Sequence, residues 1–491
     1  MVDYVIVPWI DTATGLGLDG KVISEFYIPP EMDRLAELCL KQYDMVVRDK
    51  TMITSKSDKG GAIWKLNTNH GTRSLKVLHR TPKRSLFSVE AQQYLVSQGA
   101  RIPQLIRNKK GELYCEFGGK VWIVSDWIDS LVPATKIDLS GAKALCFGLG
   151  EFHHHSKKYA PPSEAAFSSR VAKWPKHYAK MKTKMAWFRE IATIYRDLPN
   201  APRLLELVGR FEKQADEQLK LLQASDYDVM VRMGDSFWGL AHQDFGWSNG
   251  QLGDGGLWII DLDGVAFDFP FRDLRKLISS TMDDMGVWDL QWIRGMIQAY
   301  HQGNPLSQQM YELLVIDLAF PNEFYKHVKE MVFDPVPFFT RELGPILDRI
   351  MLTEQSKWIA IAELRKDMTN YKRENYEPTE TELVVDPAQT ERKSKVHVVP
   401  AYKENVAQTA LVVSPKKRSK KKLPVFKIKV KQRELKPMIK LLKELPVIKS
   451  KSKAVSKVRV KLYQGSSLVT SKTMSKKQYQ QTFKPAKKES R

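Results

Sequence analysis

The sequence is poor in cysteine. Its 491 residues include only Cys39, Cys115 and Cys146, and no two of them have the short spacing of a metal-binding motif. An odd number of widely spaced thiols argues against a disulfide framework, a structural zinc site and thiol redox chemistry. A reducing compartment suits this composition.

Long apolar runs are also missing. The first fifteen residues contain Asp3, no basic residue and an interrupted apolar stretch, so they do not resemble a signal peptide. No segment reaches the about 20 apolar residues that a membrane-spanning helix needs. We therefore expect synthesis in the cytoplasm and no membrane span. With 43% apolar and 10% aromatic residues, most of the chain can still form a globular body.

Acidic residues are scarce at the carboxyl end. Residues 391–491 hold 30 of the 78 basic and 5 of the 56 acidic residues, which gives them a net charge of +25 and leaves −3 for residues 1–390. We expect a linker rich in Glu, Thr and Pro over 371–410 and a Lys-rich, disordered tail over 411–491. In the tail, FKIKVK and SKVRVKL alternate apolar and basic residues, a weak strand pattern.

A polyanion is the partner expected for this tail, and the tail would become ordered on binding it. Specific recognition of nucleic acid is not expected, because the tail has few aromatic residues for base stacking and no known DNA- or RNA-binding module.

The sequence before the tail predicts an α+β fold. Residues 53–79 have the pattern of short strands separated by turns, residues 82–98 that of a helix, and residues 111–128 that of further strands. From about residue 135 the pattern is helical, apart from a strand-like insertion at 236–262.

These patterns divide the body into two lobes. We expect a bilobal body, with a small β-rich N-terminal lobe over 1–134 and a mostly helical C-terminal lobe over 135–370.

The strongest functional signal is the segment HQDFGWSN, from His242 to Asn249, followed by an apolar strand that ends in Asp261-Leu-Asp263. Phosphoryl transfer needs a carboxylate beside the attacking hydroxyl and oxygen ligands that hold Mg²⁺ against a nucleoside triphosphate. We therefore predict Asp244 as base or hydroxyl orienter, and Asn249 and Asp261 as metal ligands. His242 would brace the loop. Asp263 would either bind metal or cap the turn that follows it.

A nucleotide site also needs a lysine that reaches the phosphates. Lys76 lies between apolar residues in the predicted third strand of the N-terminal lobe, and Glu90 on the following helix could hold it. The alternative is that both residues lie on solvent-exposed faces. Gly60 and Gly61 would form either a loop over the phosphates or a plain hairpin turn, because the full G-x-G-x-x-G pattern is missing. The expected cofactors are ATP and Mg²⁺.

These motifs resemble a known family. HQDFGWSN, WIIDLD and FPFRDLRKLI look like the aminoglycoside phosphotransferase and choline kinase superfamily, and more closely its CotS-like branch of spore-coat-associated proteins, over about residues 30–365. The resemblance implies a bilobal protein-kinase-like fold, phosphotransfer to a hydroxyl acceptor and a place in the spore coat. It also implies that Asp273 supports the catalytic loop. Read from the residues alone, Asp273 could equally cap a helix or join a surface ion pair.

The run His153, His154 and His155 does not predict a metal site, because successive helical residues point about 100° apart. The resemblance implies a structural role for this helix end. The segment between Asp261 and Asp273 is too short for the activation segment of a protein kinase, which favours a small-molecule acceptor.

A second hypothesis is a catalytically weak or inactive kinase-like scaffold, assembled into the spore coat through its basic tail. Other coat proteins or anionic polymers would then be its partners. The incomplete glycine loop favours this hypothesis, whereas the full set of candidate catalytic residues favours the enzyme.

Overall fold

The computed structural model of the chain describes residues 4–10, 17, 22, 24, 26–134, 138–377, 409–415, 426–430, 457–464 and 467–475. The chain divides into two units, Met1–Glu382 and Leu383–Arg491. The boundary falls within the segment predicted to be a linker. None of the helices described has both the length and the apolar character needed to cross a membrane.

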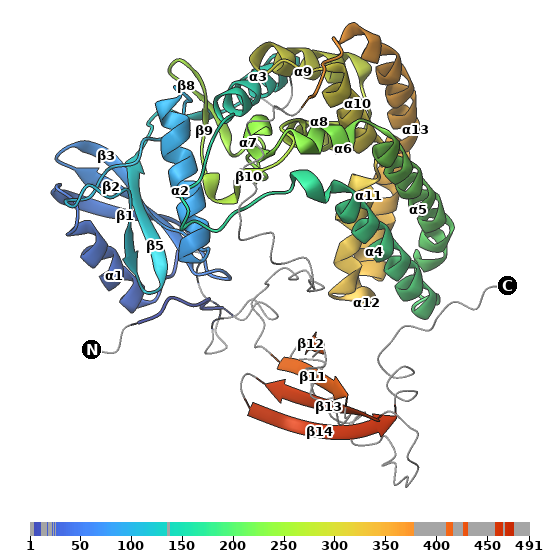
Figure 1. Ribbon diagram of the computed structural model, residues 1–491, viewed down its shortest axis with the longest axis horizontal. Helices are drawn as coiled ribbons and strands as arrows, with labels where there is room; N and C mark the ends of the chain where they lie inside the picture. Colours follow the sequence, from blue (N-terminus) through green and yellow to red (C-terminus); the bar gives the residue numbers. More distant parts are fainter. Residues whose placement is uncertain are drawn as a thin grey trace. The chain divides into compact units, whose positions relative to one another are not determined.

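The first unit contains a five-stranded antiparallel sheet in the order β1-β2-β3-β5-β4. Its strands are β1 (Val47–Lys56), β2 (Gly61–Thr68), β3 (Gly71–Val77), β4 (Cys115–Phe117) and β5 (Lys120–Asp126). Figure 1 labels β1, β2, β3 and β5 of this sheet. The predicted strand region at 53–79 contains the end of β1, from residue 53 to residue 56, and all of β2 and β3.

Helix α1 (Pro30–Leu40) packs against one face of this sheet. Its buried residues Leu35 and Cys39 belong to the same apolar cluster as Trp64 and Trp122 of the sheet. The two tryptophan rings stack with their centroids 5.7 Å apart. Burial in this shared cluster fixes α1 on the sheet, while the stacked tryptophans connect β2 with β5 within the sheet.

Helix α2 (Pro82–Ser97) packs on the other side, where Val89 shares a cluster with Ile123 of β5. Ile123 lies directly opposite Lys76 in the β3–β5 register. Directly opposite residues lie on the same face of a sheet, so Lys76 belongs to the face covered by α2. The backbone thus places this lysine opposite the α1 face.

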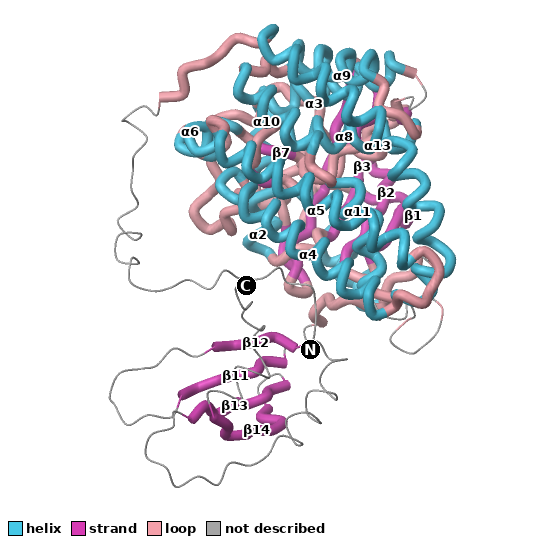
Figure 2. Tube along the Cα trace, turned by 90° about the vertical axis from the view of Figure 1, so that its right-hand side faces the viewer, coloured by secondary structure: helices cyan, strands magenta, loops and turns pink. Residues whose placement is uncertain are grey.

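Helices make up most of the rest of the first unit (Figure 2). They are α3 (Leu139–His155), α4 (Trp174–Ile194), α5 (Ala201–Ala224), α6 (Tyr227–Arg232), α7 (Asp235–Trp238), α8 (Phe271–Met285), α9 (Leu290–Gly303), α10 (Gln308–Ala319), α11 (Asn322–Val328), α12 (Pro335–Pro337) and α13 (Leu343–Asp367). Their apolar faces form one large core together with β7, β9 and β10.

Short strands interrupt these helices where the sequence predicts an insertion. They are β7 (Leu240–Ala241), β8 (Gly250–Gly253), β9 (Gly256–Ile259) and β10 (Ala266–Phe267). β7 pairs with β10, and β8 pairs with β9 and with β6 (Val132–Pro133). The HQDFGWSN segment is the loop between β7 and β8.

Helices α3 and α9 approach each other closely through two glycines. A Cβ atom on Gly150 would lie 2.6 Å from the carbonyl oxygen of Tyr300, and one on Gly303 would lie 2.4 Å from that of Phe147. No larger residue fits there without a backbone shift. This contact brings Nδ1 of His153 within 2.8 Å of the Tyr300 hydroxyl.

The second unit contains a four-stranded antiparallel sheet in the order β12-β11-β13-β14. Its strands are β11 (Thr409–Pro415), β12 (Phe426–Val430), β13 (Lys457–Gln464) and β14 (Ser467–Ser475). β12 and β13 coincide with the two weak strand patterns, whereas β11 and β14 lie where the sequence predicts only disorder. The remainder of the predicted disordered tail lies outside the described residues.

Candidate functional site

Asp273 of α8 holds the loop of residues 242–249 through hydrogen bonds to its backbone. This carboxylate is fully buried and accepts hydrogen bonds from the backbone N–H groups of His242, at 2.6 Å, and Gln243, at 3.2 Å. Arg272 donates to the Asp273 carboxylate at 2.8 Å and to the Gln243 carbonyl oxygen at 2.7 Å. Asp273 therefore supports the loop, as the family resemblance implies, and it neither caps a helix nor lies at the surface.

The charge of Asp273 is stabilised despite its burial. Burial alone would raise the pKa of Asp273, but the adjacent His153 ring and the charge of Arg272 hold that pKa far below its usual range. Nε2 of His153 lies 3.5 Å from the carboxylate, and burial lowers the pKa of this histidine. His153 is buried, whereas His154 is exposed, so the three consecutive histidines form no common site.

His242 connects the loop to the strand that leads to Asp261. Its side chain is fully buried, and Nε2 lies 2.9 Å from the carbonyl oxygen of Ile260. The predicted bracing by His242 corresponds to this contact. One side chain thus links the Asp244 loop to the residue that precedes the metal-ligand candidates.

Asp244 itself points into solvent, with 76% of its side chain exposed. Its backbone carbonyl oxygen accepts a hydrogen bond of 2.9 Å from the Asn249 amide, which closes the loop. Its carboxylate accepts a hydrogen bond of 2.9 Å from Lys276 of α8. An exposed carboxylate on a braced loop is accessible to a hydroxyl substrate.

Lys76 bridges the two carboxylates that follow β9. Its ammonium nitrogen lies 2.6 Å from Oδ1 of Asp261 and 2.7 Å from Oδ1 of Asp263. Lys56 approaches Asp261 at 3.4 Å, and His79 approaches Asp263 at 3.4 Å. These contacts join the N-terminal sheet to the segment after β9, so cations of one lobe face carboxylates of the other.

The charges of this cluster stabilise one another. Burial opposes ionisation of Lys76, but Asp263 and Asp261 outweigh it and raise the lysine pKa. Burial likewise raises the pKa of Asp263, yet Lys76 lowers it to well below the ordinary range. All three groups are therefore charged at neutral pH.

Glu90 does not take part in this cluster. Among the described residues it forms no ion pair with Lys76, whose ammonium group is held by two aspartates instead. Burial raises the pKa of Glu90, and the opposing charge nearby is that of Arg107. The structure therefore separates the two members of the predicted Lys76–Glu90 pair.

Gly60 and Gly61 lie at the turn between β1 and β2. Gly60 has a φ of +69°, which favours glycine, and Gly61 pairs with the last residue of β1. The N-terminal segment packs on this turn: a Cβ on Gly60 would lie 3.1 Å from Ile6, and the Trp9 N–H donates to the Ser57 carbonyl oxygen at 3.0 Å. The pair thus forms a hairpin turn, and its contact with phosphates stays a prediction.

The donor set at this site fits Mg²⁺. Asp261 and Asp263 offer the hard oxygen ligands that this ion prefers. Oδ2 of Asp263 is buried and lies 3.4 Å from Nδ1 of His79, without a geometric hydrogen bond to any described residue. Lys76 belongs to the same cluster, and its predicted contact with nucleotide phosphates stays a prediction.

The sequence offered no local signal for several residues of the site. Lys56, His79 and Lys276 come from β1, from the segment after β3 and from α8. Only the spacing Asp273-x-x-Lys276, one helical turn, could have suggested that Lys276 lies on the same side of α8 as the loop support.

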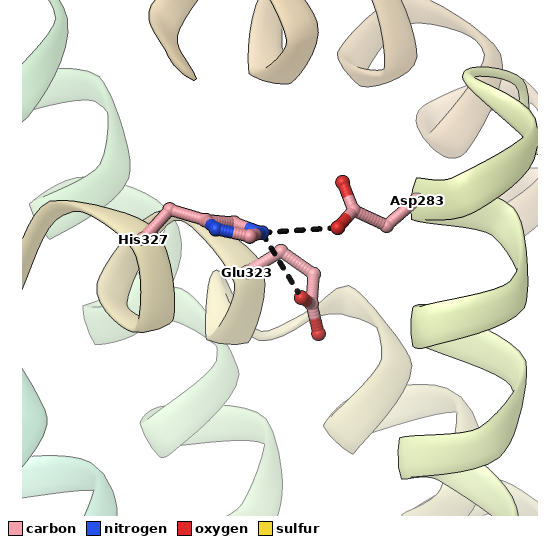
Figure 3. A group of neighbouring side chains, drawn as sticks. All are labelled: Asp283, Glu323 and His327. Carbon is pink, nitrogen blue, oxygen red and sulfur yellow. Dashed lines mark hydrogen bonds and ion pairs between the residues drawn. The ribbon is translucent and has the colours of Figure 1, made fainter. Parts of the chain in front are cut away.

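A second polar cluster lies elsewhere in the helical part (Figure 3). Nε2 of His327 lies 2.9 Å from Asp283 and 3.7 Å from Glu323, an arrangement of ligand atoms that could surround a metal ion. Both carboxylates already have cationic partners, since Arg349 lies 3.5 Å from Asp283 and Lys326 lies 3.1 Å from Glu323. Ion pairing accounts for this cluster without a metal.

The chain is similar to proteins of known name. Spore coat protein S of Bacillus subtilis (strain 168) is 29% identical over 284 residues, which cover 55% of this chain and 78% of that protein. The solved structure of an aminoglycoside phosphotransferase from Alicyclobacillus acidocaldarius subsp. acidocaldarius DSM 446 has a TM-score of 0.56 at 15% identity and covers 72% of this chain and 99% of that chain. No protein-family model matches the chain.

These comparisons confirm two predictions made from the sequence. The α+β fold, with an N-terminal antiparallel sheet followed by a helical part, is that of the kinase-like phosphotransferases. The resemblance to CotS-like spore-coat proteins is confirmed by the similarity to spore coat protein S.

Proposed function

We propose that the first unit is an ATP- and Mg²⁺-dependent phosphotransferase that acts on a hydroxyl acceptor. The observation that carries the proposal is that His242 connects the loop of Asp244 to the segment that contains Asp261. Its backbone belongs to the Asp244 loop and its side chain contacts Ile260, directly before Asp261. A candidate base and a candidate metal ligand are thus held on one braced framework, as phosphoryl transfer requires.

Each residue has a defined role in this proposal. Asp244 orients the acceptor hydroxyl and takes its proton, and Lys76 binds nucleotide phosphates. Asn249 and Asp261 hold the metal, with Asp263 beside them. Mg²⁺, when bound, would neutralise charge on the phosphates of ATP.

We further propose that the protein assembles into the spore coat. This rests on its similarity to spore coat protein S, whose name states that location. The +25 charge of residues 391–491 suits attraction to acidic coat proteins or anionic polymers, and this attraction should weaken with salt.

The alternative is an inactive kinase-like scaffold in the same assembly. The turn at Gly60 and Gly61 favours this alternative, because it lacks the full G-x-G-x-x-G pattern and Ile6 packs against it. A phosphate-covering loop needs backbone N–H groups that can approach the nucleotide.

Calorimetry of the full chain with ATP separates the two functions. The proposed enzyme binds ATP only with Mg²⁺, and Asp261→Asn weakens that binding at least about tenfold, because it removes a charged metal ligand. Asp244→Asn should bind ATP normally and release no ADP. A folded protein that binds no nucleotide under any of these conditions would refute the proposed enzyme and leave the scaffold in its place.

A further inference from the structure

Lys276 forms an ion pair that the stability of the fold does not explain. Its ammonium nitrogen lies 2.9 Å from Oδ1 of Asp244, and the two side chains are 35% and 76% exposed. Exposed pairs of this kind contribute little to stability, because water screens them and two side chains lose conformational freedom. The position of the pair, at the candidate base, points to a role in the reaction.

Helix α8 determines where this cation lies. Asp273 and Lys276 are one helical turn apart on α8, so they lie on neighbouring positions of one helix face. Asp273 is buried and holds the backbone of the loop, while Lys276 reaches the loop's exposed carboxylate. One rigid element thus fixes both the loop and the cation, which is the kind of support that positions a reactive group precisely.

The loop supplies no cation of its own. Residues 242–249 contain neither lysine nor arginine. The space beside Gly246 is open, since no heavy atom lies within 4 Å of the position that a Cβ atom would occupy there. Asp244 is the one acceptor with which Lys276 is hydrogen-bonded among the described residues. An ammonium group has three N–H donors, so two are available for the oxygens of a second anion.

We propose that Lys276 is a catalytic residue of the phosphotransfer, an inference that rests on the proposed function. In the free protein it positions the Asp244 carboxylate. With substrates bound, it donates hydrogen bonds to the phosphoryl group during transfer and stabilises the negative charge on its oxygens.

The step is balanced without any other reactant. The acceptor oxygen forms a bond to the γ-phosphorus of ATP, and the bond from that phosphorus to the bridging oxygen breaks, so that ADP leaves with the bonding electron pair. The hydroxyl proton passes to Asp244. Lys276 keeps its protons throughout.

The test is Lys276→Met in the full chain, with ADP release from Mg²⁺-ATP measured for turnover, water serving as the hydroxyl acceptor, and calorimetry for Mg²⁺-dependent ATP affinity. We expect kcat to fall about 100-fold, a loss typical of one charge-stabilising donor, while ATP affinity changes less than about threefold. Lys276→Arg should recover at least about tenfold, because arginine keeps the charge and the donors. The matched control is Lys326→Met, which removes a 3.1 Å pair with Glu323 on α11 and should leave turnover unchanged.

Three results would overturn the inference, and they differ from one another. Wild-type turnover in Lys276→Met shows that the lysine takes no part in the reaction. An equal loss of ATP affinity and of turnover, not recovered in Lys276→Arg, assigns the residue to folding or nucleotide binding. A wild-type protein that binds ATP but never releases ADP refutes the proposed function itself, before any variant is compared.

Discussion

Replacing Asp273 by asparagine perturbs the support of the candidate catalytic loop with little change in side-chain size. The variant loses the buried negative charge that accepts the N–H groups of His242 and Gln243 and pairs with Arg272. Breaking a buried ion pair costs about 3–5 kcal/mol. Because the asparagine oxygen keeps some of the hydrogen bonding, we expect the free energy of unfolding to fall by about 3 kcal/mol.

Thermal unfolding of the full chain, followed by circular dichroism at about pH 7, measures this loss. At about 2.1 cal/mol/K per residue, the unit Met1–Glu382 has an unfolding entropy of about 0.8 kcal/mol/K, so its midpoint should fall by about 4 °C. The matched control is Asp348→Asn, whose carboxylate pairs with Arg203 at 2.6 Å but is 69% exposed. It should shift the midpoint by less than about 1 °C.

The pH dependence supplies an independent check. The folded-state pKa of Asp273 lies well below the ordinary value of about 3.9. Its contribution to stability is therefore complete above about pH 4 and is lost as the pH falls toward the folded-state pKa. The difference between wild type and variant should shrink by about 1.4 kcal/mol per pH unit below about pH 4. A difference that stays constant down to about pH 2.5, or equal midpoints at pH 7, would refute the assigned role.

Three further variants test other contacts. Lys76→Met should weaken ATP binding at least about tenfold in calorimetry, because it removes the cation aimed at the phosphates; unchanged affinity would contradict this role. Gly303→Ala should cost about 1–3 kcal/mol in denaturant unfolding, since its Cβ would lie 2.4 Å from a backbone oxygen of α3, whereas Gly209→Ala meets only an arginine end at 3.4 Å and should not destabilise. Asp283→Asn should cost about 1–3 kcal/mol at neutral pH and progressively less as the pH falls below about 4. Burial raises the pKa of Asp283, but its hydrogen bond to His327 outweighs that and lowers it, so the contribution is lost on acidification.

Local sequence patterns were sufficient to predict the framework of the site. Alternation of apolar and polar residues predicts β2 and β3, and it places Lys76 on a strand whose neighbours are buried. The positions of His242, Asp244 and Asn249 predict the loop, because all three residues lie in one short stretch of backbone between β7 and β8. Both signals are contained within a few adjacent residues.

Contacts between distant segments were beyond the reach of such patterns. Lys276 reaches Asp244 only because α8 packs under the loop, and the two residues are 32 positions apart. The pairing of Lys76 with Asp263 spans 187 positions. The position of Glu90 on the next helix predicts it as the partner of Lys76, but the direction of its side chain depends on packing against elements that sequence spacing does not reveal.

The backbone around the site bears on the choice between enzyme and scaffold. Five non-glycine residues have positive φ among the residues described, and two of them, Gln243 at +71° and Asp261 at +61°, lie beside the candidate base and at the candidate metal ligand. Such conformations cost free energy and persist only where surrounding contacts impose them. Here Asp273 fixes the N–H of Gln243, and Lys76 fixes the carboxylate of Asp261. A scaffold gains nothing from strained backbone that presents an exposed carboxylate, whereas a phosphotransferase needs that carboxylate to be held in place, so this geometry favours the enzyme.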